Sequence, residues 1–269
     1  MKYPMIDVII PCFNCRQTLT RAVDSVLAQP NVGKLWLVDD ASIDGTDELA
    51  RQLQRKYPEK ICVEQMPKNS GVAKARNWGA LQSNAEIIAF LDADDAYEEG
   101  ALENASAVFA FRPEINVLRL SLKPVDLPQR YAEQADFAQA WRYMEMTCGG
   151  NLVFNRSFFL ACGGFPQQPL FQQLGGEDGA LGIATTKLCV VGTLFDEAGV
   201  LHYCREGMHA QRLLDGLLFG QYDKRITQEK LDEANQVTES ICQRVARLKH
   251  NLNHSPTGVL PLNIERAQQ

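Results

Sequence analysis

Two groups of aspartates stand directly after apolar runs that have the character of buried strands. Asp39 and Asp40 end the stretch LWLVDD, and Asp92, Asp94 and Asp95 follow the stretch EIIAFL. Like charges held close together raise one another's pKa values and destabilise a fold. A divalent cation removes this repulsion, and hard oxygen ligands suit Mg²⁺ or Mn²⁺, which also bind substrate phosphates. The groups therefore indicate a metal-assisted phosphate site, although an Asp-x-Asp spacing alone also fits a helix cap followed by solvated acids.

A third group of acids, Glu177 and Asp178, stands in the stretch GGEDGAL, where a Gly-rich turn precedes a helical pattern. Acids in the first turn of a helix are stabilised by its dipole. This capping role does not exclude a chemical one. His202 follows in the stretch GVLHY, at the end of a short strand pattern, where a lone His is more often structural.

Cys12 and Cys15 form a C-x-x-C pair between a strand pattern and a helix pattern. Such a pair can be a redox motif or half of a zinc site. A structural zinc site needs a second pair or two matching His residues, and the sequence has neither. A thiol oxidoreductase would leave the three acidic groups unexplained. We therefore expect both thiols to be reduced and without a chemical role.

Strand and helix patterns alternate through the first 112 residues, which predicts a mostly parallel α/β sheet. Strands are expected at 7–11, 35–40, 60–65 and 86–95, and helices at 19–27, 46–57, 72–82 and 98–111. Asn14, with Gln17 three residues later, is expected to cap the first helix. Ligands bind beyond the carboxyl ends of strands in such sheets, and the aspartates stand at those ends.

The regular alternation of strands and helices weakens after residue 112. No linker is visible in the sequence, so the domain boundaries rest on this change of pattern. We expect one domain over residues 1–220, with a nucleotide-binding half at 1–112 and an acceptor-binding half at 113–220. Residues 221–269 are expected to form a helical extension and a loose tail. The apolar stripe of this helix predicts that it folds back on the domain; a homodimer contact and a membrane-surface helix are the alternatives.

The composition limits the partners of the chain. Its 269 residues carry a net charge of −6, whereas nucleic-acid-binding proteins usually show a basic footprint. No run approaches the roughly 20 apolar residues that span a bilayer. The N-terminal residues lack the pattern of a signal peptide. These features predict a cytoplasmic protein, or one that is peripheral at the inner face of a membrane.

Five motifs occur in order, each at an expected strand end or helix start: VIIPCFN, VDDASIDGT, NSGVAKARN, AFLDADD and GGEDGAL. Together they resemble family 2 glycosyltransferases, which are inverting enzymes with the GT-A fold. The resemblance covers roughly Val8 to Tyr203. It implies a Rossmann-like, mostly parallel sheet flanked by helices and a transfer of sugar from a nucleotide-sugar, most simply a UDP-sugar, to a hydroxyl of a carbohydrate, glycolipid or glycoprotein acceptor.

The resemblance also assigns roles around the nucleotide. The strand end from Pro11 to Asn14 would line the nucleotide pocket, and Asp40 would accept a hydrogen bond from the base. Arg76 would lie near the diphosphate, where its planar fork matches phosphate oxygens. Asp92, with Ala93 beside it, would contact the ribose or the donor sugar.

The remaining roles concern metal and catalysis. Asp94 would hold Mn²⁺ or Mg²⁺ on the diphosphate, with His202 as a second ligand and His209 as its competitor. Asp178 would be the catalytic base, oriented with the acceptor by Glu177. Trp141, Gly149 and Gly150 would shape the acceptor pocket.

Two further features define the enzyme class that the resemblance implies. The chain lacks the Q-x-x-R-W motif and the membrane helices of processive synthases, which favours single additions. A nucleotide-sugar-binding protein without transfer activity remains an alternative, as does a nucleotidyltransferase. The latter should carry a Gly-rich basic loop after the first strand, and the stretch PCFNCRQT contains no Gly.

Overall fold

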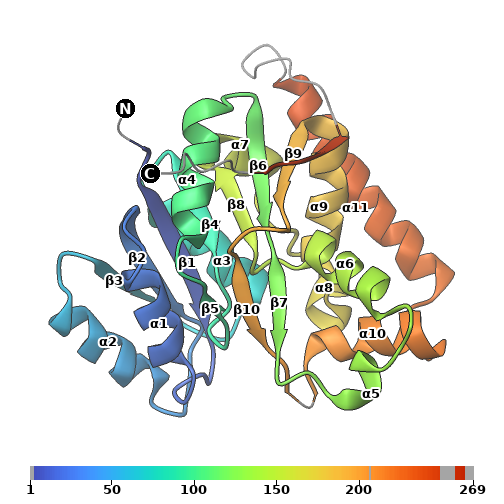
Figure 1. Ribbon diagram of the computed structural model, residues 1–269, viewed down its shortest axis with the longest axis horizontal. Coiled ribbons are helices and arrows are strands. Elements are labelled where there is room, and N and C mark those ends of the chain that lie inside the picture. Colours follow the sequence, from blue (N-terminus) through green and yellow to red (C-terminus); the bar gives the residue numbers. More distant parts are fainter. Residues whose placement is uncertain (1–2, 206, 249–257, 264–269) are drawn as a thin grey trace.

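The fold consists of one large and one small β-sheet with helices on both faces of the large sheet (Figure 1). The computed structural model describes residues 3–205, 207–248 and 258–263. Within them the large sheet has the strand order β11-β9-β6-β8-β4-β1-β2-β3, and the small sheet has the order β5-β10-β7. The expected α/β class with a mostly parallel sheet is confirmed.

The large sheet is parallel except at one strand. Its strands, in chain order, are β1 (Ile6–Cys12), β2 (Val32–Asp39), β3 (Ile61–Gln65), β4 (Ile87–Phe90), β6 (Ile115–Leu120), β8 (Leu152–Asn155), β9 (Val190–Leu194) and β11 (Gly258–Pro261). Strand β8 lies between β4 and β6 and is antiparallel to both. The carboxyl ends of β4 and β6 therefore lie beside the amino end of β8, at the same end of the strands.

Alternating residues of β1 bury their side chains on opposite faces of the large sheet. Val8 and Ile10 belong to a hydrophobic cluster on one face, and Ile9 belongs to a cluster on the other. The first cluster includes residues of α1 (Leu19–Leu27), α2 (Thr46–Lys56), α4 (Ala101–Phe111), α6 (Phe137–Thr147) and α10 (His209–Phe219). The second includes residues of α3 (Val72–Gln82), α7 (Arg156–Cys162), α9 (Glu177–Leu188) and α11 (Gln228–Arg247). Two short helices, α5 (Gln129–Ala132) and α8 (Pro169–Leu174), complete the described fold.

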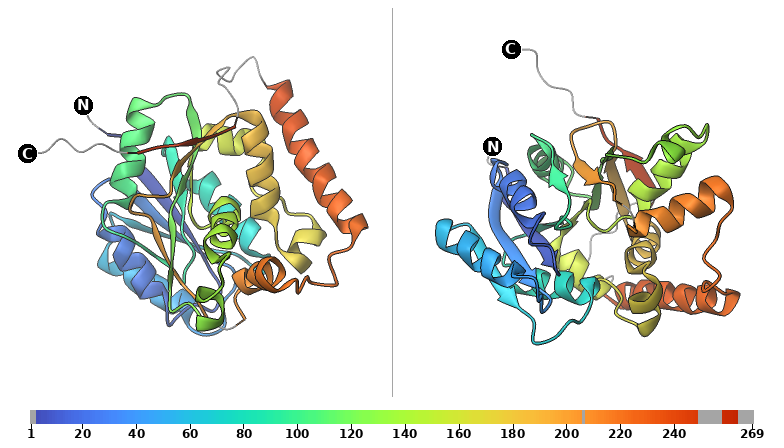
Figure 2. Two further views of the ribbon diagram at one scale, coloured as in Figure 1. Left: turned by 45° about the vertical axis from the view of Figure 1, so that its right-hand side comes forward. Right: turned by 90° about the horizontal axis from the view of Figure 1, so that it is seen from below.

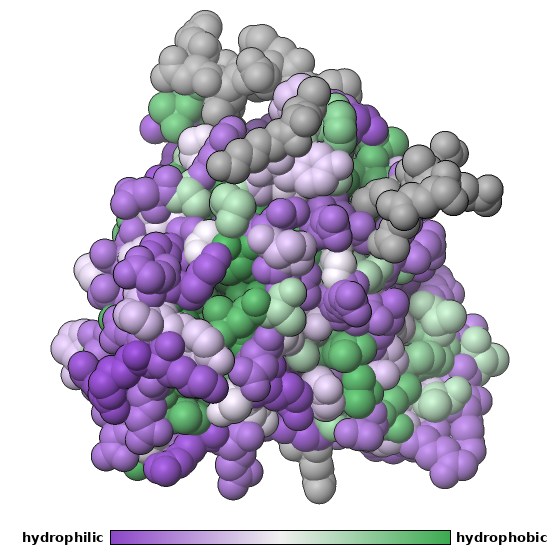
Figure 3. All heavy atoms as spheres, turned by 60° about the vertical axis from the view of Figure 1, so that its left-hand side comes forward, coloured by the Kyte–Doolittle hydropathy of each residue, from purple (hydrophilic) through white to green (hydrophobic). Residues whose placement is uncertain are grey.

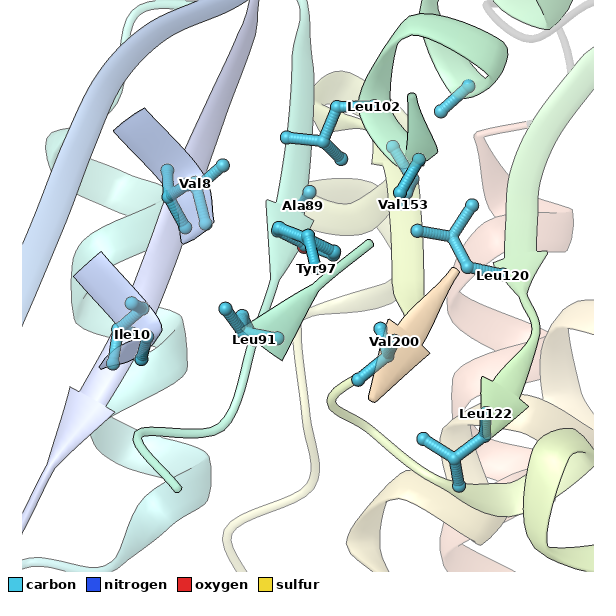
Figure 4. Packing of buried hydrophobic residues seen from close by; sticks show 14 of the residues in the cluster. Val8, Ile10, Ala89, Leu91, Tyr97, Leu102, Leu120, Leu122, Val153 and Val200 are labelled. Carbon is cyan, nitrogen blue, oxygen red and sulfur yellow. The ribbon is translucent and has the colours of Figure 1, made fainter. Parts of the chain in front are cut away.

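The small sheet packs over the first face of the large one. Its strands are β5 (Ala96–Tyr97), β7 (Leu122–Val125) and β10 (Val200–Tyr203). Figure 4 shows Tyr97 and Val200 from this sheet beside Ala89 and Val153 from the large one, all within a single hydrophobic cluster. This packing fixes β10 and the segment after β4 against each other, so the residues that follow them are close in space.

The start of the first helix differs from the sequence-based expectation. Asn14 does not cap α1, which begins at Leu19 after Thr18. Its side-chain oxygen instead accepts a hydrogen bond from the Ile43 backbone N–H at 2.9 Å, and its φ is 49°. Asn tolerates this left-handed conformation better than most residues. Asn14 therefore ties the turn after β1 to the turn after β2.

The C-terminal extension folds back on the domain, as its apolar stripe predicted. Helix α11 packs along α9 and α7 and buries Ile241 and Val245 (Figure 2). The expected loose tail is wrong for Gly258–Pro261, because these residues form β11 and pair in parallel with β9. The rest of that tail, residues 249–257 and 264–269, lies outside the described residues. The division into halves at residue 112 remains a prediction.

Hydrophilic residues predominate on the face of the molecule that Figure 3 displays, with hydrophobic residues gathered in small areas between them. None of the described helices is both long enough and apolar enough to cross a bilayer.

The close packing of α3 against the sheet gives a test of the fold. A Cβ on Gly79 would lie 2.6 Å from Ile9 Cγ2 and 3.1 Å from Val38 Cγ2. We expect Gly79→Ala to push α3 off the sheet and to lower the free energy of unfolding by about 1–3 kcal/mol. Thermal unfolding measures this loss as a fall in Tm of several degrees.

A matched control is Gly179→Ala in α9, where no atom lies within 4 Å of the added Cβ. Ala favours a helix over Gly by about 1 kcal/mol, so this variant should keep or raise the Tm. Equal Tm values for the two variants would contradict the close packing of α3.

Candidate active site

The site is organised around Arg76, a guanidinium in α3 that is only 4% exposed. Its Nη2 pairs with Asp92, which directly follows β4 and Leu91, and its Nη1 lies 3.6 Å from Glu177 Oε1 at the start of α9. Arg76, Asp92 and Glu177 were all predicted site residues, and the structure brings them together from three elements. Each acid gains a buried cation, and neither would be stable there without one.

The charges of this cluster shift one another's pKa values. Burial alone would lower the pKa of Arg76, but the carboxylates of Asp92, Glu177 and Asp178 raise it above its ordinary value. Burial, with the Asp178 charge, raises the pKa of Glu177 to about 7 against the opposing effect of Arg76. Burial also raises the pKa of Asp178, which Arg76, the Gly179 backbone N–H and Arg119 oppose. Arg76 therefore favours the ionised forms of Glu177 and Asp178 against the effect of their burial.

Two glycines let the backbone before β8 pass directly over this cluster. A Cβ on Gly149 would lie 2.6 Å from Arg76 Nη1, and one on Gly150 would lie 2.9 Å from Asp92 Oδ2. Any side chain at these positions would displace the ion pair. Trp141, the third residue expected to shape a pocket here, is 6% exposed, and its ring centroid lies 6.1 Å from that of His202. It is therefore part of the wall behind the site.

Asp40 anchors the start of α3. Its two oxygens accept the backbone N–H groups of Ser70 and Gly71, both at 2.8 Å. Asp40 is 3% exposed, and its neighbour Asp39 is 1% exposed and accepts from the Ser42 N–H. A carboxylate oxygen has two lone pairs, so Asp40 keeps acceptor capacity beyond these bonds. Its predicted contact with a base stays a prediction.

The turn after β1 forms the neighbouring border of the site. Pro11 is half-buried in β1 opposite Val38, and Asn14 is exposed. Cys12 is buried, and its thiol hydrogen-bonds to that of Cys15, an interaction that lowers the pKa of Cys15 and raises that of Cys12. All eight cysteines are free thiols. That Cys12 and Cys15 are reduced and without a chemical role stays a prediction.

The predicted metal ligands lie close together but have protein partners. Asp94 Oδ2 accepts from Arg205 Nε at 3.0 Å and Nη2 at 2.8 Å. His202 Nδ1 lies 2.8 Å from Oδ2 of Asp95, the residue after Asp94. Burial lowers the pKa of His202, but the bond to Asp95 and the charges of the neighbouring aspartates raise it above its usual value. His209 begins α10, and its side chain lies outside the described residues.

The residues present fit a divalent ion only in part. Among the described residues, no three His, Cys, Asp or Glu side chains are arranged to hold a metal. However, His202 Nε2 is buried and has no hydrogen-bond partner in the described structure, while the other ring nitrogen is held by Asp95. A carboxylate behind a histidine typically orients the free nitrogen toward a metal. Asp94 and His202 therefore suit an ion that takes its other ligands from phosphates and water.

Sequence reasoning gave no separate role to several residues that hold this side of the site. Asp95, seen in the sequence only as one of a group of acids, is fully buried and also accepts the Tyr203 backbone N–H at 3.1 Å, and burial raises its pKa to about 6 against the His202 bond. Arg21 in α1 donates to the Asp94 carbonyl oxygen and stacks 3.5 Å from the ring centroid of Tyr203. Arg21 and Arg205 stand 73 and 111 residues from Asp94 in sequence, so only the fold relates them to it.

Comparison with known proteins gives a family for this arrangement. The sequence model of the family described as "Glycosyl transferase family 2" matches residues 7–161, more than half of the chain. The putative teichuronic acid biosynthesis glycosyltransferase TuaG of Bacillus subtilis is 38% identical over 101 residues, which cover 37% of this chain and 40% of TuaG. The poly(ribitol-phosphate) beta-N-acetylglucosaminyltransferase TarP of Staphylococcus aureus is 39% identical over 103 residues, covering 37% of this chain and 31% of TarP. The chain spans less than half the length of these curated relatives.

Solved structures show the same fold over most of the chain. S. aureus TarS 1–349 in complex with UDP-GlcNAc superimposes with a TM-score of 0.60 and 20% identity, covering 89% of this chain and 72% of TarS 1–349. The mannosyltransferase PcManGT of Pyrobaculum calidifontis, in complex with GDP-Man and Mn²⁺, superimposes with a TM-score of 0.59 and 20% identity, covering 94% and 77%.

The raised pKa of Glu177 predicts that the stability of the folded protein falls as pH rises. A folded-state pKa of about 7 lies above the ordinary value of 4.5, so its contribution to stability is full below about pH 4.5 and is lost as pH rises through 7. We expect Glu177→Gln to raise the Tm at pH 8 by several degrees, equivalent to about 1–3 kcal/mol. Near pH 4.5 the two proteins should unfold at nearly equal temperatures.

Glu233→Gln, an exposed change in α11, is the control and should leave the Tm unchanged at both pH values. A Tm gain for Glu177→Gln that is the same at pH 4.5 and pH 8 would contradict the buried, ionised state of Glu177.

Proposed function

We propose that this chain, which belongs to glycosyl transferase family 2, is an inverting, metal-dependent glycosyltransferase that moves a sugar from a nucleotide-sugar to a hydroxyl of an acceptor. The acceptor is a carbohydrate, free or on a lipid or protein. Asp178 is the catalytic base, and Glu177 orients the acceptor or the base.

The observation that carries the proposal is the convergence of three carboxylates on one buried cation. Asp92 follows β4 and pairs with Arg76, while Glu177 and Asp178 come from the start of α9, which is distant in sequence. A transferase needs a donor site and a proton acceptor within one molecular length of each other. Arg76 provides the link, because it touches Asp92 on the donor side and Glu177 on the acceptor side.

The donor side stabilises the departing nucleoside diphosphate. Arg76 contributes a fixed positive charge in a water-poor site, where such a charge acts strongly on a developing anion. Asp92, held by Arg76, would contact the ribose or the sugar, together with the neighbouring Ala93. A divalent ion bound between Asp94 and His202 would supply further neutralisation of the diphosphate. Pro11 and Asn14 border the space for the base, and Asp40 lies behind it.

The acceptor side removes a proton. Burial raises the pKa of Asp178, which makes its carboxylate a stronger base than a solvated aspartate, and the guanidinium groups of Arg76 and Arg119 oppose this rise. Asp178 is half-buried and so remains accessible to a hydroxyl group. A direct displacement with the base on the side opposite the leaving group inverts the anomeric carbon. The acceptor hydroxyl itself attacks the sugar, so no side chain of the protein forms a covalent intermediate.

The nucleotide is inferred from the structural relatives. TarS is solved with UDP-GlcNAc, and PcManGT with GDP-Man and Mn²⁺. We propose a UDP-sugar donor with Mn²⁺ or Mg²⁺. A thermal-shift series with UDP-, GDP- and dTDP-sugars, each with and without Mn²⁺, identifies the nucleotide, because a ligand stabilises the state that it binds.

The base assignment gives a prediction that also separates transfer from binding alone. Asp178→Asn should reduce transfer about 100-fold or more while leaving the Kd of UDP and Mn²⁺ within about twofold, because general bases contribute to rate rather than to donor affinity. Product formation and isothermal titration measure the two quantities. Asp196→Asn, at an exposed position before β10, is the control and should retain both. Loss of UDP binding in Asp178→Asn would refute the base assignment, and a wild type that binds donors without transfer would favour the binding protein.

The metal assignment gives a second prediction. Asp94→Ala should weaken Mn²⁺-dependent UDP binding about tenfold or more, since loss of a ligand costs at least as much as loss of an outer partner. UDP titrations with and without Mn²⁺ measure the dependence. Asp24→Ala, at an exposed position in α1, serves as the control. An unchanged metal dependence in Asp94→Ala would exclude Asp94 as a ligand.

A further inference from the structure

Arg119 is the largest side chain that the described fold buries almost completely, at 1% exposed. It lies near the carboxyl end of β6, opposite Leu152 of β8 and Thr193 of β9. Its Nη1 donates to the carbonyl oxygens of Glu145 at 3.2 Å and Cys148 at 3.1 Å. Carbonyl groups satisfy donors but do not neutralise a charge. An arginine buried without a close carboxylate is costly, so its presence calls for a function.

The second terminal nitrogen of Arg119 points toward helix α9. Nη2 is buried and has no hydrogen-bond partner among the described residues, and a Cβ on Gly182 would lie 2.6 Å from it. Gly182 stands four residues after Asp178 and therefore lies one turn below it on the same face of the helix. The glycine leaves the space that the guanidinium occupies. The charge of Arg119 is thus placed against α9 one turn after Asp178, near enough for the two charges to influence each other.

The two groups influence each other's ionisation. Burial lowers the pKa of Arg119 to about 10, and the Asp178 charge opposes this fall. Burial raises the pKa of Asp178, and Arg119 is among the groups that lower it. Arg119 stays charged at neutral pH, so its field favours the ionised form of Asp178.

The hydrogen bonds of Arg119 reach the other part of the site as well. By holding the carbonyls of Glu145 and Cys148, Nη1 fixes the backbone that leads into Gly149 and Gly150. These glycines lie against Arg76 and Asp92. One side chain therefore supports both the donor-side ion pair and the acceptor-side acid.

We propose that Arg119 is a positioning residue for the transfer reaction, which sets a fixed positive charge against the helix that carries Asp178 and holds the Cys148–Gly150 backbone over Arg76 and Asp92. This role rests on the proposed function in one respect, namely that Asp178 acts as the base. Arg119 does not touch the reacting atoms, because it is covered by α6, β8 and α9.

The groups that face Asp178 come from every element around it. Arg76 on α3 and Arg119 on β6 are the cations, and Asp92 after β4 and Glu177 on α9 itself are the other carboxyl groups. The Cys148 thiol after α6 is neutral, because burial raises its pKa. Removing Arg119 would leave three acids with a single cation.

The first test is the pH dependence of transfer in Arg119→Met and Arg119→Lys. In Arg119→Met we expect the acid limb of kcat/KM to move to higher pH, because Asp178 loses a cation that favours its ionised form. Arg119→Lys keeps the charge and should keep the position of that limb, although with a lower maximum. An acid limb of folded Arg119→Met at the wild-type position would overturn the proposal, since a purely structural role does not move it.

The second test does not use activity and so separates this proposal from the proposed function. Thermal unfolding of wild type, Arg119→Met, Asp178→Asn and the double variant is measured at pH 5 and pH 8. We expect Arg119→Met to lose more Tm at pH 8, and Asp178→Asn to recover part of that loss, because it removes the unpaired charge. Additive Tm changes at pH 8 would overturn the proposal. A non-additive cycle in a protein without transferase activity would refute the proposed function while supporting the coupling.

Gly182→Ala provides the same test where Arg119→Met does not fold. The added Cβ lies 2.6 Å from Nη2 at the flexible end of the Arg119 side chain, with the Met146 carbonyl oxygen at an ordinary 3.6 Å, so the guanidinium has to shift. We expect the same direction of pH shift with the arginine still present. Ile183→Ala, the next position of the same helix and 51% exposed, is the control and should keep the wild-type pH profile. A Gly182→Ala protein with the wild-type pH profile would overturn the proposal.

Discussion

The buried ion pair between Arg76 and Asp92 is the interaction on which the site depends. A guanidinium that is 4% exposed needs a carboxylate to compensate for its lost hydration, and Asp92 after β4 supplies the direct partner, with Glu177 at the start of α9 lying 3.6 Å away. The benefit is mutual, because a buried carboxylate also needs a cation beside it. Both parts of the chain therefore have to be folded before either set of charged groups is stable.

The architecture serves this requirement through β8, the one antiparallel strand of the large sheet. By pairing with both β4 and β6 it joins the early strands to the later ones in a continuous hydrogen-bonded surface. The segment that enters β8 carries Gly149 and Gly150 over the ion pair. Charged residues from α3, from the segment after β4, from β6 and from α9 thus meet at one end of these central strands.

The sequence predicted the first hundred residues well, because alternating strands and helices leave a strong periodic signal and the acids stand at the strand ends. Arg76, Asp92 and Glu177 were identified in this way, with the help of the family resemblance, and they are in contact. Asn14 was misjudged as a helix cap, since a cap and a left-handed turn residue share the same side chain. Arg119 gave no signal at all, because an arginine within an apolar strand resembles an exposed position until the fold encloses it. Asp95 was seen only as one acid of a group, and its role as the partner of His202, like the role of Arg21, became visible through tertiary contacts with β10.

Strand β11 forms one outer edge of the large sheet. Gly258–Pro261 pairs in parallel with β9, so the backbone of β9 is hydrogen-bonded on this side and the exposed edge passes to β11. An exposed strand edge is a template for pairing with other chains, and short edge strands and prolines limit such pairing. The C-terminal segment therefore replaces the five-residue edge of β9 with a four-residue edge that ends in Pro261, which has no backbone N–H to donate.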